Sequence, residues 1–224
     1  MKKNLIIYVK FYYFCLVKDI LDTLGNVPVT TAAIASLYTG VTGVNQKVAA
    51  LEHSGKLLRL KRGLYVVNPA ASGKPVSTYL VANHLYTPSY ISMHTALRWY
   101  GLIPEHVHLM QSMTIKPSRQ FKNALGSFDY IKVSRDYFSI GLRQEMSEDS
   151  AFIIASPEKA LCDLIITTGG INLRYLKEAE AFLEEDMRID LDDIKDFDLN
   201  ILRQCAQNGK KSTSIETIIK LLER

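Results

Sequence analysis

The chain has 224 residues, of which 47% are apolar and 22% are charged, and its net charge is +4. This apolar content excludes a disordered protein and is enough for one large domain or two small ones. Residues 1–70 hold nine Lys and Arg against three Asp and Glu, whereas residues 71–224 hold 18 against 20. The positive charge is therefore concentrated at the start of the chain, as expected of a module that contacts nucleic acid.

The N-terminal residues 5–17 are strongly apolar, but they have the pattern of neither a signal peptide nor a membrane span. Lys10 and Lys18 interrupt the apolar run, and no small-residue cleavage site follows. Apolar residues at helical spacing instead predict an amphipathic helix that packs on the next domain or on a second copy. A cytoplasmic location without membrane contact is expected, because three isolated cysteines fit a reducing compartment: Cys15, Cys162 and Cys205.

Residues 29–67 are the most informative stretch, VTTAAIASLYTGVTGVNQKVAALEHSGKLLRLKRGLYVV. Thr30 or Thr31 can cap a short alanine-rich helix, and two glycines then mark the turn to a second helix. Gly55 ends the second helix, and a hairpin with its tip at residues 61–63 follows. The second helix has one apolar stripe, which is expected to face the core: Val44, Val48 and Leu51.

Two short helices and a basic hairpin predict a winged helix-turn-helix domain over residues 1–70. Such a domain places its second helix in the major groove of DNA, where Asn and Gln pair with adenine, while cations on the hairpin neutralise phosphates. The residues expected at the bases are Thr42, Asn45, Gln46, Ala49 and His53. Those expected at phosphates are Lys56, Arg59, Lys61 and Arg62. The alternatives are a solvated hairpin and a winged helix that docks protein.

Residues 68–75 are rich in turn formers and are predicted to link the first domain to a second one, over residues 75–224. Helices are expected near 76–85, 89–100, 157–167, 172–185 and 214–223, and Ser156 is expected to cap the third of them. Strands are expected near 107–115, 128–133, 139–144 and 151–155. This order predicts an α+β domain with a mainly antiparallel sheet flanked by helices.

No active site emerges from the second domain. His106 and His108, with His94 nearby, have the spacing of a metal site, but no cysteine or carboxylate completes the set. Asp129 resembles the first carboxylate of a nucleotidyltransferase motif, yet Ile131 stands where the second is required. No catalytic residue, metal or cofactor is therefore predicted.

Two charged regions remain in the second domain. A second basic surface is expected from Lys116, Arg119, Lys122, Lys132, Arg135 and Arg143. These cations extend a DNA footprint, bind an acidic partner, or guard a solvated sheet edge. Residues 178–198 hold ten acids against two Lys and Arg, so they are expected to repel DNA and either to engage a basic partner or to be solvated helices.

Three segments of the chain resemble AbiEi-type antitoxins of bacterial abortive-infection systems, which are type IV toxin–antitoxin systems. They are SGKLLRLKRGLYVV, YLVANHLYTPSYISMHTALRWYGLIPE and ASPEKALCDLI, and the resemblance runs from about residue 16 to about residue 183. The hairpin pattern is shared with many regulators. The most distinctive part is Ser92-x-x-x-Ala96-Leu97 and Gly101-Leu102, joined to Ser156-Pro157-Glu158-Lys159-Ala160-Leu161 and Asp163.

The resemblance implies a non-catalytic protein with an N-terminal winged helix and a C-terminal α+β antitoxin domain. Members of the family repress their own operon by binding inverted repeats, and they counteract a nucleotidyltransferase-like toxin encoded beside them. For this chain it implies double-stranded operator DNA as a partner, read by the residues named above. It further implies a cognate toxin, countered by contact or by opposing its product, and a role of the Lys116 to Arg143 set in antitoxicity.

Two other classes stay open. A regulator of another kind would sense a small ligand with its C-terminal domain. A nuclease or nucleotidyltransferase would use the winged helix for targeting, but the absence of a carboxylate cluster disfavours it. Whether the protein binds DNA as a monomer or as a homodimer also stays open.

Overall fold

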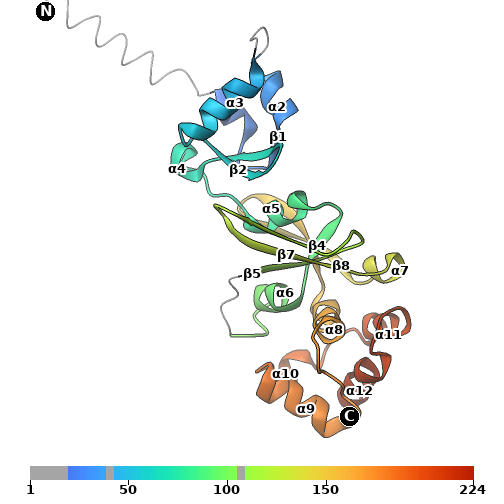
Figure 1. Cartoon of the computed structure of the whole chain (residues 1–224). Helices are drawn as coiled ribbons and strands as arrows, with labels where there is room; N and C mark the ends of the chain where they lie inside the picture. The colour runs from blue at the N-terminus through green and yellow to red at the C-terminus, as the bar shows by residue number, and fades with distance from the viewer. Residues whose placement is uncertain (1–19, 39–42, 105–108) are drawn as a thin grey trace, which may run out of the picture. The chain divides into compact units, whose positions relative to one another are not determined.

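Residues 20–38, 43–104 and 109–224 are described in the computed structural model, which combines helices with two β-sheets (Figure 1). The expected α+β class is confirmed. The chain divides after Val76 into two units, and each is considered by itself. The amphipathic helix expected at residues 5–17 lies outside the described residues, as do Thr42, His106 and His108.

The N-terminal unit contains the two short helices and the hairpin that the sequence predicts. Its elements are η1 (Ile20–Leu24), β1 (Val29–Thr30), α2 (Thr31–Ser36), α3 (Val44–His53), β2 (Leu57–Lys61), β3 (Leu64–Val67) and α4 (Pro69–Ser72). The three strands form an antiparallel sheet in the order β1-β3-β2. The apolar stripe of α3 packs on one face of this sheet, and the core consists of Leu21, Val29, Ile34, Val48, Leu51, Leu57, Tyr65 and Val67.

The C-terminal unit contains a six-stranded sheet in the order β6-β7-β5-β4-β9-β8. Its first elements are α5 (Thr78–Leu85), β4 (Ser89–Ile91), α6 (Met93–Trp99), β5 (Leu109–Thr114), β6 (Arg119–Asn123) and β7 (Gly126–Lys132). Next come α7 (Arg135–Phe138), β8 (Leu142–Ser147), β9 (Ser150–Ala155) and α8 (Pro157–Thr167). The helical end comprises α9 (Leu176–Ala181), the π-helix η2 (Phe182–Asp186), α10 (Leu191–Ile194), α11 (Leu199–Asn208) and α12 (Ser212–Leu222).

The sheet of this unit is mixed, so the expectation of a mainly antiparallel sheet is right only in part. The pairs β4–β5, β6–β7 and β8–β9 are antiparallel, whereas β4–β9 and β5–β7 are parallel. The two hairpins are antiparallel because a short turn reverses the chain. β7 runs parallel to β5 because β6, which lies between them in sequence, runs in the opposite direction. β4 and β9 are joined by residues 92–149, a connection long enough for parallel pairing.

Two strands are absent from the sequence prediction. β4 falls inside the helix expected at 89–100, because its three residues are all buried and a strand buried on both faces lacks polar alternation. β6 has the sequence RQFKN and lies at an edge of the sheet, where charged residues replace the usual strand formers.

Other boundaries also differ from the prediction. The strand expected at 139–144 begins at Leu142, because residues 139–141 form the turn after α7. The helix expected at 172–185 begins at Leu176, and α11 is not predicted at all. The helix after Ser156 is confirmed together with its cap, since Ser156 Oγ accepts a hydrogen bond from the Lys159 amide at 3.3 Å.

Helices cover both faces of the six-stranded sheet (Figure 1). On one face lies α5, where the Tyr130 hydroxyl of β7 donates to the Ala82 carbonyl at 2.6 Å and the rings of Tyr79 and Phe152 stack. On the other face lies α8, where Lys159 Nζ is 5.8 Å from the centre of the Tyr90 ring of β4. The residues before and after Tyr90 in β4 face the opposite side of the sheet, because side chains alternate along a strand. α6 packs beside α8.

A buried ion pair lies at the contact between α8 and the sheet. Lys159 Nζ is 3.2 Å from Asp163 Oδ1, and neither side chain is exposed to solvent. The Ser92 hydroxyl, just after β4, donates to Asp163 Oδ2 at 2.5 Å, and Lys159 donates to the Tyr137 carbonyl at 3.0 Å. Burial raises the pKa of Asp163, while Lys159 and Ser92 act in the opposite direction. The two most distinctive segments of the resemblance therefore meet in one buried polar cluster.

Removing one partner of this pair is expected to leave an uncompensated charge in the core. Asp163→Asn should lower the free energy of unfolding by about 3–5 kcal/mol, whereas Lys159→Met with Asp163→Asn should cost less than the single change. Unfolding in denaturant is followed by the fluorescence of Trp99, the only tryptophan.

Arg203→Ala is the control for that comparison. It breaks an ion pair with Glu223 whose side chains are about half exposed, so the expected loss is below about 1 kcal/mol. A double variant less stable than Asp163→Asn would contradict the explanation by an unpaired charge.

Candidate nucleic-acid interface

The outer face of α3 is exposed along its whole length. Val48 and Leu51 are buried against the sheet, and the residues between them and on either side face solvent. Four of the five residues expected at bases lie together on this outer face: Asn45, Gln46, Ala49 and His53. They stand at positions i, i+1, i+4 and i+8 of one helix, which is a spacing that places them along one flank.

The end of α3 is fixed by backbone hydrogen bonds. The Gly55 amide donates to the Glu52 carbonyl at 3.0 Å, and the Lys56 amide donates to the Leu51 carbonyl at 2.9 Å. Together with the positive φ of 71° at Gly55, this is a Schellman motif. It reverses the chain at once, so that β2 starts two residues after Gly55.

The hairpin is held at both of its ends. At the tip, Arg62 and Gly63 form a two-residue loop in which Gly63 has a φ of 77°, and the Gly63 carbonyl accepts from the Thr31 amide at 3.1 Å. At the base, the Asn68 side chain donates to the Gly55 carbonyl at 2.7 Å, and the Asn68 amide donates to the Lys56 carbonyl at 2.9 Å. The tip is thereby placed beside the start of α2.

The cations expected at phosphates do not share one environment. Lys56 and Arg62 are exposed, and Lys61 is half-buried. Within the described residues, no ion pair or hydrogen bond engages the Arg62 side chain. It is the cation of this hairpin most available to a partner.

Arg59 is bound to the protein itself. Its Nη2 donates to Glu52 Oε2 at 2.5 Å and its Nε to the same oxygen at 3.1 Å, and the guanidinium lies 5.8 Å from the centre of the Tyr65 ring. The hydrogen bond with Glu52 raises the pKa of Arg59. The ion pair links α3 to β2 across the turn at Gly55, so Arg59 has a role in the unit that the sequence does not reveal.

Lys47 is a further cation on α3 that the sequence interpretation omits. It is exposed, next to Gln46, and its ammonium lies 5.3 Å from the centre of the Tyr38 ring. Its position next to Gln46 on the helix is the signal that could have identified it, because phosphate contacts in protein–DNA complexes are commonly made by Lys and Arg.

The six cations expected to form a second basic surface are separated in the C-terminal unit. Four gather around β6 and β7: Lys116, Arg119, Lys122 and Lys132. Arg135 begins α7, and Arg143 lies on β8 at the opposite edge of the sheet, 3.9 Å from Glu158. The set is therefore not one continuous surface, because the strand order separates residues that are near in sequence.

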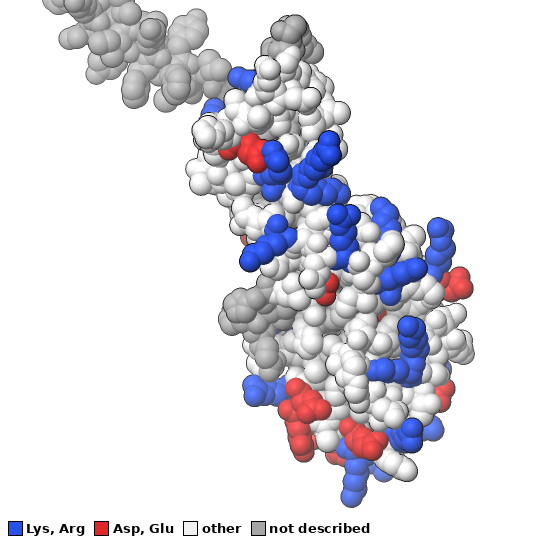
Figure 2. All heavy atoms as spheres, viewed as in Figure 1, with Lys and Arg blue, Asp and Glu red and all other residues white. Residues whose placement is uncertain are grey.

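The acidic residues 178–198 lie on α9, η2, α10 and the loops that follow them, and most are exposed. Figure 2 shows acidic side chains gathered over this end of the C-terminal unit on the face in view. Several of them cap helices: Asp190 and Asp198 accept amides of α10 and α11, and Glu178 accepts the amides of Arg174 and Tyr175. Those two amides lower the pKa of Glu178.

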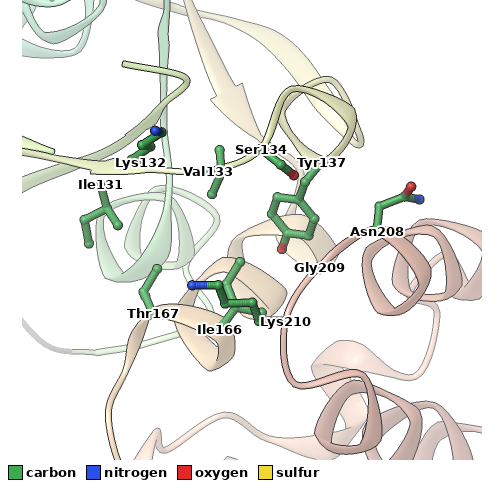
Figure 3. Close-up of a pocket in the computed structure, with 10 residues that line it drawn as sticks. All are labelled: Ile131, Lys132, Val133, Ser134, Tyr137, Ile166, Thr167, Asn208, Gly209 and Lys210. Atoms are coloured by element: carbon green, nitrogen blue, oxygen red, sulfur yellow. The ribbon is translucent and has the colours of Figure 1, made fainter. Parts of the chain in front are cut away.

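A pocket of about 740 Å³ lies between the end of β7, α7, the end of α8 and the turn after α11 (Figure 3). Ile131, Val133 and Ile166 give it an apolar wall, and Lys210 extends across it toward Thr167. Its residues include no Asp or Glu. This volume lies in the range of pockets that hold small molecules.

The part of the chain that the structure describes contains no candidate metal cluster and no candidate membrane-spanning helix. No group of three or more His, Cys, Asp and Glu there could hold a metal ion, and His94 instead contacts Gln111 Oε1 through its ring at 3.2 Å. None of the helices in residues 20–38, 43–104 and 109–224 combines the length and apolarity needed to cross a bilayer.

No protein-family model matches the chain, and no curated protein matches it either.

The turn after α3 gives a prediction about backbone conformation. Gly55→Ala should lower the free energy of unfolding by about 1–2 kcal/mol, because an L side chain is strained at positive φ. A Cβ at this position meets no atom within 4 Å, so crowding does not contribute.

Gly169→Ala is the matched control, since its φ is not positive and a Cβ there also meets nothing within 4 Å. Both variants are measured by denaturant unfolding followed by circular dichroism. Equal losses in the two variants would contradict a conformational cause.

Proposed function

We propose that this chain is a DNA-binding antitoxin that represses its own operon, with the N-terminal unit acting as a winged helix. The observation that carries the proposal is the exposed flank of α3, which bears Asn45, Gln46, Ala49 and His53 beside a basic hairpin. Three of these four side chains are small or carry an amide, which suits a helix that lies deep in a major groove.

The roles within the unit divide between base readout and backbone contact. Asn45 and Gln46 offer paired donors and acceptors to base edges, whereas Lys47, Lys56 and Arg62 offer charge to phosphates. Arg59 is assigned a positioning role, because its guanidinium is already bound by Glu52. It would hold the hairpin at a fixed angle to α3 while the tip contacts the backbone.

The antitoxin part of the proposal rests on the resemblance to AbiEi-type proteins. The distinctive segments of that resemblance supply Ser92, Lys159 and Asp163, which are buried together and thus support the fold of the C-terminal unit. A contact that counters a toxin would use exposed residues elsewhere in that unit. Growth recovery on co-expression with a nucleotidyltransferase-like toxin encoded beside the gene tests this part.

A second candidate function is a winged-helix regulator that senses a small ligand. The pocket beside Tyr137 and Lys210 favours it, because this site is large enough for a metabolite and lies outside the DNA-binding unit. A nuclease or nucleotidyltransferase has no comparable support, since Asp129 has no second carboxylate beside it and Asp163 is buried in an ion pair.

The test of DNA binding is a gel-shift titration of the full chain on its own upstream region and on random DNA of equal length. At about 150 mM salt the upstream fragment should bind at least about a hundredfold more tightly than random DNA. Equal, weak binding to both would reject a sequence-specific repressor and leave a docking or non-specific module.

Arg62→Ala should weaken binding to all DNA sequences alike, because a phosphate contact carries no sequence information. The slope of log affinity against log salt should fall by about 0.9, the contribution of one phosphate. Arg203→Ala, which removes the same charge from α11, should leave the slope unchanged. An unchanged slope for Arg62→Ala would show that Arg62 does not contact a phosphate.

Gln46→Ala should reduce discrimination rather than general affinity. If Gln46 pairs bidentately with adenine, the preference for operator over random DNA should fall by about 1–3 kcal/mol. Ala50→Ser, another exposed change on α3, is the control. A preference that survives Gln46→Ala unchanged would remove Gln46 from base readout.

A further inference from the structure

The six-stranded sheet ends in two edge strands of different character, β6 and β8. β6 carries Arg119 and Lys122 and no acid, so two copies of this edge would repel one another. β8 has the sequence LRQEMS, in which one cation and one acid, Arg143 and Glu145, stand two residues apart. β8 is thus the edge whose charges do not oppose pairing with a second copy of itself.

The residues of β8 are complementary to themselves in one antiparallel register. With a two-fold axis at Gln144, Arg143 lies opposite Glu145 of the second copy, and the reciprocal pair forms by symmetry. In the same register Leu142 lies opposite Met146 of the second copy, again twice. Opposite charges and apolar pairs placed directly across two strands both stabilise a sheet.

The pairing of β8 with β9 shows that these two kinds of contact fall on different faces. Arg143 pairs with Ile154 and Glu145 with Phe152, so both charged side chains share one face of the sheet. Leu142, Gln144 and Met146 share the opposite face, because successive side chains alternate. One face would therefore receive the two charged pairs, and the other would receive the two apolar pairs on either side of the Gln144 pair.

The two charged side chains of β8 are available for further ion pairs. Within the described residues Glu145 forms no ion pair, and Arg143 approaches Glu158 only to 3.9 Å, the outer limit of an ion pair. Glu158 Oε2 is buried and has no hydrogen-bond partner among these residues. Arg143 can accordingly serve a carboxylate of a second copy without giving up a strong contact of its own.

The apolar face is exposed where such a contact would cover it. Met146 is 58% exposed and Ile153 of β9 is 36% exposed, so both rank among the few large apolar residues on the described surface. Ala151, directly opposite Met146 on β9, is exposed as well. These residues form an apolar strip along the outer end of the sheet.

We propose that β8 is a self-association edge, at which two copies of the chain pair antiparallel about Gln144 and join their sheets. The occupant is a second copy because the charges and apolar residues of β8 match themselves in one register. This inference stands on the C-terminal unit alone and does not depend on DNA binding.

Cross-linking tests the register. Directly opposite residues of an antiparallel pair have Cα atoms about 4.5–5.5 Å apart, within the range of a disulfide. Gln144→Cys in the full chain, with Cys15→Ser, should therefore form a disulfide-linked dimer under oxidised glutathione. Met146→Cys, which faces Leu142 rather than itself, should not. No dimer with Gln144→Cys, or equal dimer with both, would overturn the register.

A charge swap tests the pairing without cross-linking. Arg143→Glu and Glu145→Arg should each raise the dissociation constant of the dimer about tenfold or more, because like charges then face one another twice. The double variant exchanges the two charges and should restore association. Sedimentation velocity measures each chain, and circular dichroism checks its fold. A wild-type chain that stays monomeric, or a double variant as weak as the singles, would overturn the proposal.

Discussion

The ion pair of Lys159 with Asp163 is the constraint on which the C-terminal unit depends. Both groups are removed from water, so each has to be satisfied by a partner that is in place. Asp163 accepts a hydrogen bond from the hydroxyl of Ser92, just after β4, and Lys159 donates one to the carbonyl of Tyr137, in α7. Three segments that are distant in sequence are therefore held at one point, and the sheet and its helices are arranged around it.

Local signals account for the parts of the fold that the sequence predicts. The helix after Ser156 is predictable because its cap, its proline and its apolar run all act within a few residues. β4 is not, because the same three residues are compatible with a helix until β5 and β9 pair with them on both sides. β6 is not predicted either, because it is an exposed edge strand and such a strand needs no apolar alternation.

The candidate interface likewise combines features that local sequence signals predict with features that depend on the whole fold. The exposed flank of α3 follows from helical spacing, so Asn45, Gln46, Ala49 and His53 could be grouped without a structure. The partner of Arg59 could not, because Glu52 comes within reach only once the Schellman motif has turned the chain. Nor could the separation of Arg143 from Arg119 be foreseen, since strand order is a property of the whole sheet.

The hairpin of the N-terminal unit is held by main-chain groups at its tip and by Asn68 at its base. Neither anchor involves the side chains of Lys61 or Arg62. The position of the tip therefore does not depend on the Arg62 side chain, and the charge of Arg62 can be altered without moving the hairpin. Such a tip can diverge rapidly between relatives, while Gly55, Gly63 and Asn68 are the positions at which change would be costly.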